Sequence, residues 1–410
     1  MTLYFLMTAL FVIMAILGAL DAALASYNLL PWFNGLRWVR VHLITLGAMT
    51  EALFGLLPLL VAIRHNLPKP RFRWDIWLTL NIGLLTLLIG IPIIQPPLIF
   101  TGGTLIFVAT VLLIWQLKQM KPVPSNDTET SNAASGRNFY IAGLTFLLLG
   151  IIIGTGLWLQ WSDFLQIKVP IEVHIHANNW GFMSLVFAGL LIDLYPKWAK
   201  RPFANSQTIT RIFWLMTLGA LGLVLGPWFQ SLYYTVPGLV MHLTATIWLL
   251  VEVIKPLRGD KEAWSTPGFW HLTTAYVWLL APVAIAPLIL LSVPGFPGAG
   301  IEQNAPQALI YGWVFQFGFA LLPYFFRRAF QPTSEPALGG NWFSLVTVHL
   351  GGVFLWASIF IASLQTVLHG TAYLLWAAAV VPIAKDLWQI ASSGLSRLEE
   401  EVVVKGATGD

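Results

Sequence analysis

Residues 175–192 read IHANNWGFMSLVFAGLLI, and the same pattern occurs at 41–58 (VHLITLGAMTEALFGLLP) and at 306–323 (PQALIYGWVFQFGFALLP). Each segment has nearly the length of a membrane-spanning helix, which needs roughly 20 apolar residues. When His42, His176 and Gln307 are aligned, a glycine follows five residues later in all three segments. We interpret this as three repeats, approximately 1–136, 137–265 and 266–395; the alternative is a chance similarity between Gly- and Leu-rich membrane helices.

The composition favours a membrane protein over a soluble one. Hydrophobic residues make up 57% of the 410-residue chain and charged residues 10%, whereas soluble domains have about 25% charged residues. We predict an all-α polytopic membrane protein with one transmembrane domain, residues 1–410. Its architecture would be about twelve transmembrane helices in three four-helix arcs with pseudo-threefold symmetry. The predicted spans are 3–25, 37–63, 74–95, 97–118, 138–162, 171–196, 208–231, 233–254, 268–293, 304–329, 340–365 and 368–390.

The basic residues give this chain an orientation. All of the 22 Lys and Arg residues except Arg37, Arg40 and Lys168 lie after even-numbered spans or near the C-terminal end. Because cytoplasmic loops of membrane proteins carry an excess of Lys and Arg, we predict an integral inner or cell membrane protein with both termini in the cytoplasm. The net charge of +4 then reflects topology, so the expected partner is membrane lipid and not nucleic acid.

The chain contains no cysteine, which excludes thiolate-bound metals and disulfides and leaves histidine as the expected metal or haem ligand. Five of the eight histidines lie well inside predicted spans, where ionisable groups are costly and usually functional. His65 lies in a predicted cytoplasmic loop, His271 near the start of a span and His369 at the outer boundary, and all three are interpreted as ordinary interfacial residues. The intramembrane histidines are His42, His174, His176, His242 and His349.

His174 and His176 form an H-x-H sequence near the outer end of the span 171–196. Residues two apart on a helix point about 200° apart, so each imidazole can reach a different cofactor. His42 lies at an equivalent depth, and a haem held by two histidines needs imidazoles from two helices. The sequence therefore favours a haem held by His42 and one of the H-x-H pair. Interhelical hydrogen bonding is the alternative role for all three histidines.

Further residues are candidates around this cofactor. Gly47 and Gly181 would let a flat macrocycle approach the backbone, and Arg37 and Arg40 would pair with haem propionates or anchor the helix at the interface. His242 and His349 could be further haem or copper ligands, or could simply hydrogen-bond neighbouring helices, and the sequence leaves both readings open.

Residues 173–198, VHIHANNWGFMSLVFAGLLIDLYPKW, resemble the H-x-H helix of the catalytic subunits of haem–copper oxidases and nitric oxide reductases. They are equally similar to the NnrS family of membrane proteins, which are associated with haem, copper and nitric oxide stress. The resemblance implies that His176 and His42 hold a low-spin haem and that His174 holds a high-spin haem. It implies one or two haem b groups and an electron-transfer subunit such as a cytochrome as partner.

Three departures from the family limit what carries over. The chain has no His-His pair, Ala177 stands in place of the Glu of the NnrS pattern H-x-H-E, and Gln307 stands where an oxidase would carry its H-x-H. A standard copper site is therefore not expected. The resemblance implies electron transfer or nitric oxide or oxygen chemistry of the oxidoreductase type. Two alternatives are a proton-coupled secondary transporter, in which Asp21 and Glu51 carry protons, and a non-catalytic haem-bearing membrane subunit.

Overall fold

A computed structural model describes residues 2–29, 37–121, 135–201, 203, 205–331 and 337–408, with the side chains of residues 2, 37 and 398–408 left out. Every regular element in these ranges is a helix. Eleven helices are long and apolar enough to cross a membrane, and Trp74–Gly90 is a shorter apolar helix of 17 residues. The chain is therefore an all-α, multi-pass integral membrane protein.

The chain forms two compact units, Met1–Leu53 with Asp260–Asp410, and Phe54–Gly259. We call them the first and second units and describe each separately. The helices of the first unit are α1 (Thr2–Ser26), α2 (Arg37–His42), η1 (Leu43–Met49), the start of α3 (Thr50–Arg64), α12 (Lys261–Ser265), α13 (Pro267–Thr274), α14 (Tyr276–Leu290), α15 (Gly298–Leu309), η4 (Ile310–Val314), α16 (Phe315–Phe330), α17 (Trp342–Phe360), η5 (Ala362–Leu364) and α18 (Gln365–Thr408). The second unit contains the rest of α3, α4 (Trp74–Gly90), α5 (Pro96–Gln119), α7 (Arg137–Leu159), α8 (Pro170–His176), η2 (Ala177–Met183), α9 (Ser184–Trp198), α10 (Ser206–Phe229), α11 (Leu232–Ile254) and η3 (Lys255–Leu257).

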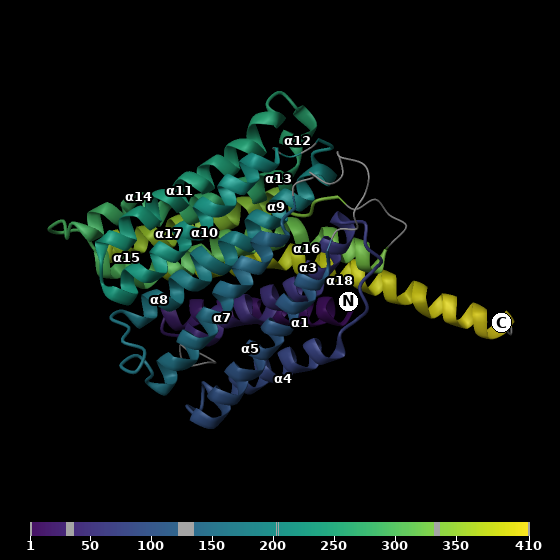
Figure 1. Cartoon of the computed structure of the whole chain (residues 1–410), viewed down its shortest axis with the longest axis horizontal. Coiled ribbons are helices and arrows are strands. Elements are labelled where there is room, and N and C mark those ends of the chain that lie inside the picture. Colours follow the sequence, from purple (N-terminus) through teal and green to yellow (C-terminus); the bar gives the residue numbers. More distant parts are fainter. Residues whose placement is uncertain are drawn as a thin grey trace. The chain divides into compact units, whose positions relative to one another are not determined.

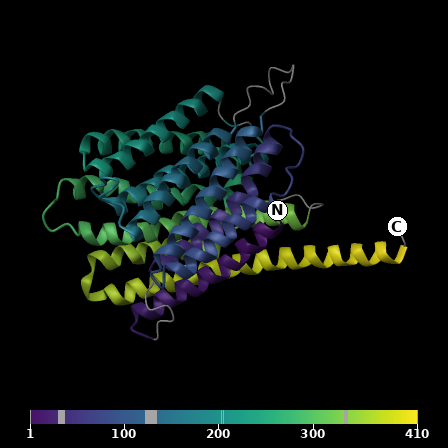
Figure 2. The same cartoon turned by 60° about the horizontal axis from the view of Figure 1, so that its bottom comes forward.

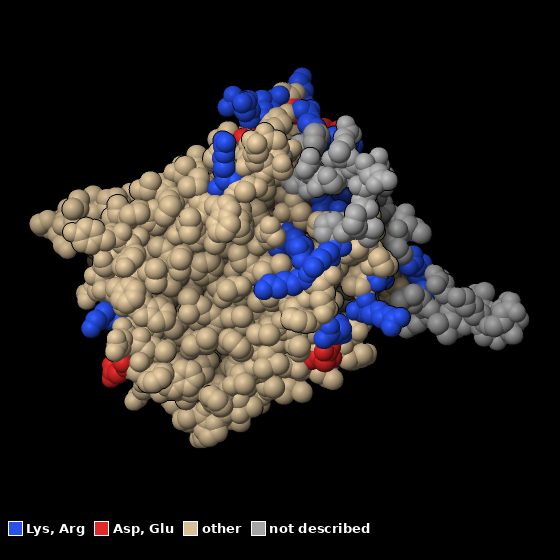
Figure 3. Space-filling view, viewed as in Figure 1, with Lys and Arg blue, Asp and Glu red and all other residues tan. Residues whose placement is uncertain are grey.

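Neighbouring helices pack lengthwise within each unit (Figure 1). In the second unit α10 packs on α11, α4 on α5, and α5 on α7. In the first unit α18 packs against α1, α16 and α17, and it is one continuous helix of 44 residues (Figure 2). The outward side chains are apolar, as lipid requires: Figure 3 shows a nearly uncharged surface with Lys and Arg in a few places.

Three continuous helical segments are far more buried than the others. Buried residues make up 83% of the most apolar stretch in Trp38–Arg64, 83% in Pro170–Trp198 and 89% in Gly298–Phe330, against at most 44% in the other spans. A helix that is apolar all round and buried belongs to the interior. These are the three segments whose sequences align.

Each of these segments contains a π-helical turn, η1, η2 or η4, next to a close aromatic contact. The aligned glycine lies within the π turn, and a ring from an earlier helix of the same unit occupies the place of its missing Cβ. An added methyl group would overlap that ring. The pairs are Gly47 with Phe11, Gly181 with Phe146, and Gly312 with Trp278.

Candidate functional site

The H-x-H sequence ends the short helix α8, immediately before the π turn η2. The His174 ring lies against α7, where its Nδ1 is 2.9 Å from the Gly150 carbonyl oxygen. The His176 ring turns to α10, where its Nδ1 is 2.6 Å from the Leu223 carbonyl oxygen. The two imidazoles therefore point to different helices, as the i, i+2 spacing predicts.

These contacts fix the tautomers of both rings. A carbonyl oxygen only accepts, so Nδ1 carries the proton in these contacts and Nε2 then keeps its lone pair. Nδ1 of His174 also lies 3.4 Å from the Asn178 amide nitrogen, a longer contact than the 2.9 Å to the carbonyl oxygen. Histidines that bind metals usually donate their other ring N–H to a carbonyl or carboxylate in this way. Both side chains are half-buried, so they are not sealed in the core. The ring of His174 also fills the space beside Gly154, where a Cβ would overlap it.

His42, in the first unit, has the same arrangement. It ends α2 immediately before η1, and its Nδ1 lies 2.8 Å from the Trp38 carbonyl oxygen. Its ring stacks on the Trp38 indole with centroids 4.3 Å apart and planes at 17°. The carbonyl contact and the stacked indole together orient the imidazole.

Side-chain donors accompany the π turns. A π turn shifts the backbone hydrogen-bond pattern to i→i+5, and buried carbonyl groups need partners. Thr50 Oγ1 donates to the Thr45 oxygen at 2.8 Å. Gln316 Nε2 donates to the Gly312 oxygen at 2.7 Å. Because π turns inside α-helices occur frequently at functional sites, the positions of His42 and His176 directly before two of them support a role beyond packing.

In His242 and His349 both ring nitrogens have hydrogen-bond partners within the protein. His242, 1% exposed, lies 3.2 Å from the Trp180 oxygen through Nε2 and 3.3 Å from Thr246 Oγ1 through Nδ1. His349 accepts from the Trp278 indole through Nδ1 at 3.1 Å and contacts Thr274 Oγ1 through Nε2 at 2.9 Å. This geometry matches interhelical hydrogen bonding, the second of the two roles that the sequence leaves open.

The remaining candidates are placed as follows. Arg40 lies 3.8 Å from the buried carboxylate of Asp21 and over the ring of Tyr373, so its guanidinium already has an anionic neighbour. Arg37 begins α2, and its side chain is outside the described residues. Rings of the protein itself pack beside Gly47 and Gly181. The roles of these residues next to a haem stay predictions.

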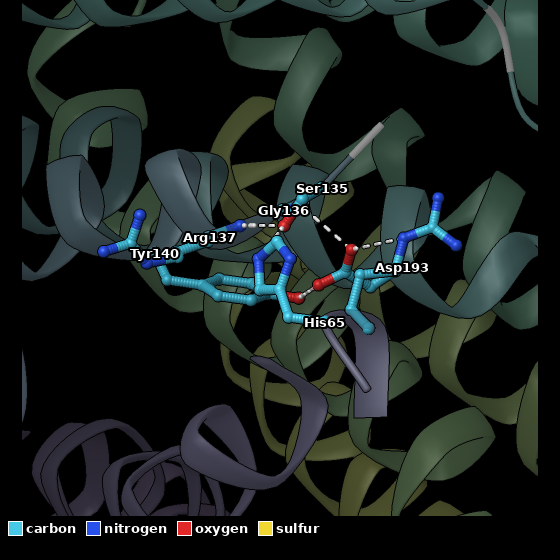
Figure 4. Close-up of polar contacts among 7 residues, drawn as sticks. His65, Ser135, Gly136, Arg137, Tyr140 and Asp193 are labelled. Carbon is cyan, nitrogen blue, oxygen red and sulfur yellow. Dashed lines mark hydrogen bonds and ion pairs between the residues drawn. The ribbon is translucent and has the colours of Figure 1, made fainter. Parts of the chain in front are cut away.

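The sequence analysis missed a polar cluster around Asp193, at the end of α9 (Figure 4). We call Arg64, Gly136, Tyr140 and Asp193 the Asp193 cluster. The Gly136 N–H donates to Asp193 Oδ1 and the Tyr140 hydroxyl to Oδ2, both at 2.8 Å, while Arg64 Nε is 3.9 Å from Oδ1. The cluster therefore joins α3, α7 and α9 within the second unit. The signal in the sequence was a single acidic residue within an otherwise apolar stretch, LLIDLYP.

His271 lies near the start of its span, and it is 0% exposed, so the protein itself encloses its ring. His65 does lie at a helix end, with Nε2 3.4 Å from Ser135 Oγ. Its pKa is lowered, first by burial and then by Arg137 and Arg64. His369, at the start of α18, contacts Ser26 through Nδ1 at 2.8 Å.

No protein-family model matches the chain, and neither does any curated protein. Within the residues that the structure describes, no three His, Asp or Glu side chains converge as a metal-binding group. The candidate site residues are therefore single imidazoles, each oriented by a backbone carbonyl group.

Proposed function

We propose that this membrane protein binds haem b through the oriented histidines and uses it for electron transfer or for nitric oxide or oxygen chemistry. The observation that carries the proposal is the shared hydrogen-bond pattern of His42, His174 and His176. Each has Nδ1 within hydrogen-bond distance of a backbone carbonyl oxygen, and in the tautomer that donates from Nδ1 the ligand nitrogen would be Nε2. His242 and His349 have partners at both nitrogens and are not part of the proposed ligand set.

The residues of this chain would supply binding and orientation. His174 and His176 would each serve a different haem, because they are directed to α7 and α10. The carbonyl partners hold each ring in the ligand tautomer and raise the basicity of Nε2. Bound haem supplies one-electron chemistry and, where one axial position is open, a place for a diatomic gas. The pairing of His42 with His176 stays a prediction.

The finer architecture is part of the same proposal. Three four-helix repeats with pseudo-threefold symmetry are supported by three local features that recur in the aligned segments: high burial, a π turn, and a glycine covered by an aromatic ring. Cytoplasmic termini are supported by the distribution of Lys and Arg.

The absorption spectrum of the purified protein tests the proposal. After expression with added haem, we expect a Soret band and a haem b pyridine haemochrome. His174→Ala and His176→Ala should each lower the haem-to-protein ratio, whereas the matched control His349→Ala, whose ring nitrogens both have protein partners, should keep the wild-type ratio. A folded wild-type protein without haem would refute the proposal, as would a loss of haem that is equal in the control.

Further measurements separate the proposed function from the two alternatives, a non-catalytic haem-bearing subunit and a transporter. Elemental analysis should find iron with little copper if the missing His-His pair means that no copper site exists. A haem protein that neither consumes nitric oxide nor oxygen when a reductant is supplied would favour the non-catalytic subunit. A colourless protein that takes up substrate in proteoliposomes would be a transporter.

A further inference from the structure

His271 is a buried imidazole that plays no part in the proposed haem site. It is the fifth residue of α13 in the first unit, and its side chain is enclosed by three elements of that unit. Phe319 of α16 meets its ring edge-to-face with centroids 5.6 Å apart. On another side the ring fills the space beside Gly340, a residue with φ of +87° whose Cβ would overlap the imidazole.

Both ring nitrogens of His271 face hydrogen-bond acceptors. Nε2 lies 3.3 Å from the Asn341 carbonyl oxygen, which can only accept. Nδ1 lies 3.3 Å from Gln316 Oε1. The orientation of the Gln316 amide is fixed by its other end, because Nε2 donates to the Gly312 carbonyl at 2.7 Å. Turning the amide over would place two oxygens against each other, so Oε1 must face His271.

A neutral imidazole has one N–H and can satisfy one of these two acceptors. The doubly protonated ring has two and satisfies both. We propose that His271 is a proton-binding site of this protein, where uptake of one proton at the ring links Gln316 of α16 to Asn341 at the start of α17. The bound proton adds one positive charge and one hydrogen bond. A continuous series of hydrogen bonds then runs from the Gly312 carbonyl in η4 through Gln316 and His271 to the Asn341 carbonyl.

His349, on α17, provides an internal comparison. Its Nδ1 accepts from the Trp278 indole, which can only donate. Its Nε2–H faces Thr274 Oγ1, whose hydroxyl donates in turn to the Trp270 carbonyl at 2.6 Å. A neutral His349 ring satisfies every donor and acceptor in this series of hydrogen bonds. Nothing in the hydrogen bonding of His349 therefore favours a second proton.

Charged neighbours do not account for the difference. Among the described residues, the titratable group that interacts electrostatically with His271 is His349 itself. The packed elements otherwise present Gln316 and Phe319 from α16, and Gly340 and Asn341 from the turn before α17. None of these side chains titrates. Burial of the ring opposes the cationic form, and the two acceptors are the feature that acts against this cost.

Nitrogen-15 NMR of the full-length protein with labelled histidine side chains tests the proposal. The His271 signals are those that disappear in His271→Gln. In the wild type we expect them to move to the doubly protonated position only in the acid range, as the pH falls from 6 to 3, because burial of the ring opposes the charged form. Gln316→Leu removes one acceptor and should lower the midpoint by about one to two pH units, the worth of one hydrogen bond to a charged group.

Two further variants keep the test decisive. Gln316→Glu places a carboxylate beside the ring and should shift the midpoint in the opposite direction, to higher pH, even if the leucine variant does not fold. Thr274→Val removes a partner of His349 and leaves both acceptors of His271 in place, so the His271 midpoint should not move. A ring that stays neutral down to pH 3 in the wild type, or a midpoint insensitive to residue 316, would overturn the proposal.

Discussion

The Asp193 cluster predicts a large loss of stability when one carboxylate is removed. Asp193 has a side chain 1% exposed and accepts from the Gly136 N–H and the Tyr140 hydroxyl. In Asp193→Ala both donors remain buried without an acceptor. Each unsatisfied buried donor costs about 1–3 kcal/mol, so the two together should cost about 2–6 kcal/mol.

The ion pair adds little to this estimate. The Arg64 side chain is 24% exposed and its Nε is 3.9 Å from the carboxylate, and pairs that reach solvent contribute about 0–1 kcal/mol. Tyr140→Phe removes one donor to a charged acceptor and should cost about 1.5–3 kcal/mol. Because Tyr140 and Asp193 contact each other, their effects should not add, and we expect a coupling of about 0.5–3 kcal/mol.

Unfolding of the purified protein in mixed micelles, followed by tryptophan fluorescence, measures these differences. Tyr140→Phe, Asp193→Ala and the double variant form the cycle. Asp75→Ala is the matched control, since Asp75 also pairs with an arginine in the second unit but has a half-exposed side chain. If Asp193→Ala costs no more than Asp75→Ala, or if the two cluster variants are additive, the carboxylate does not hold the three helices together.

Three other predictions concern pH, packing and topology. The pKa of His65 is lower in the folded protein than its ordinary value of about 6.5, so the unfolded chain binds more protons below that pH. Acidification should therefore destabilise the wild type more than His65→Gln, as unfolding midpoints at several pH values would reveal. Gly312→Ala forces a methyl group onto an indole ring and should lower the free energy of unfolding by about 1–3 kcal/mol. The control Gly318→Ala, where the nearest atom is 3.7 Å away, should lower it by nothing. Equal melting temperatures of the two variants would contradict the packing argument. Since the chain has no cysteine, single cysteines at the exposed positions Lys69 and Lys168 can be labelled in intact cells, and we expect only the second to react with an impermeant reagent.

Hydropathy predicted the membrane-spanning helices because lipid imposes an apolar stretch of nearly fixed length. The predicted span 97–118 corresponds to Pro96–Gln119 and 138–162 to Arg137–Leu159. The directions of the H-x-H side chains followed from the angle of 100° per residue. These properties depend on residues close together in the sequence.

The π turns and the polar clusters depend on information that is not local. A π turn adds a residue to one helical turn, so a helical wheel drawn through η1 or η2 assigns the wrong face to everything that follows. The partners of Asp193 lie on α7, more than 50 residues away. His271 has an apolar sequence context similar to that of an interfacial residue, and only the positions of α16 and Gly340 reveal that it is enclosed.

The length of α18 has a mechanical consequence. At about 1.5 Å per residue, its 44 residues extend about 66 Å, roughly twice the thickness of the hydrocarbon layer. The first charged residue, Lys385, comes only after about 30 Å of helix, so the remainder continues into the headgroups and water without a loop. α1, α16 and α17 pack against α18, and Pro382 lies inside this helix shortly before Lys385, at the kind of residue where helices bend.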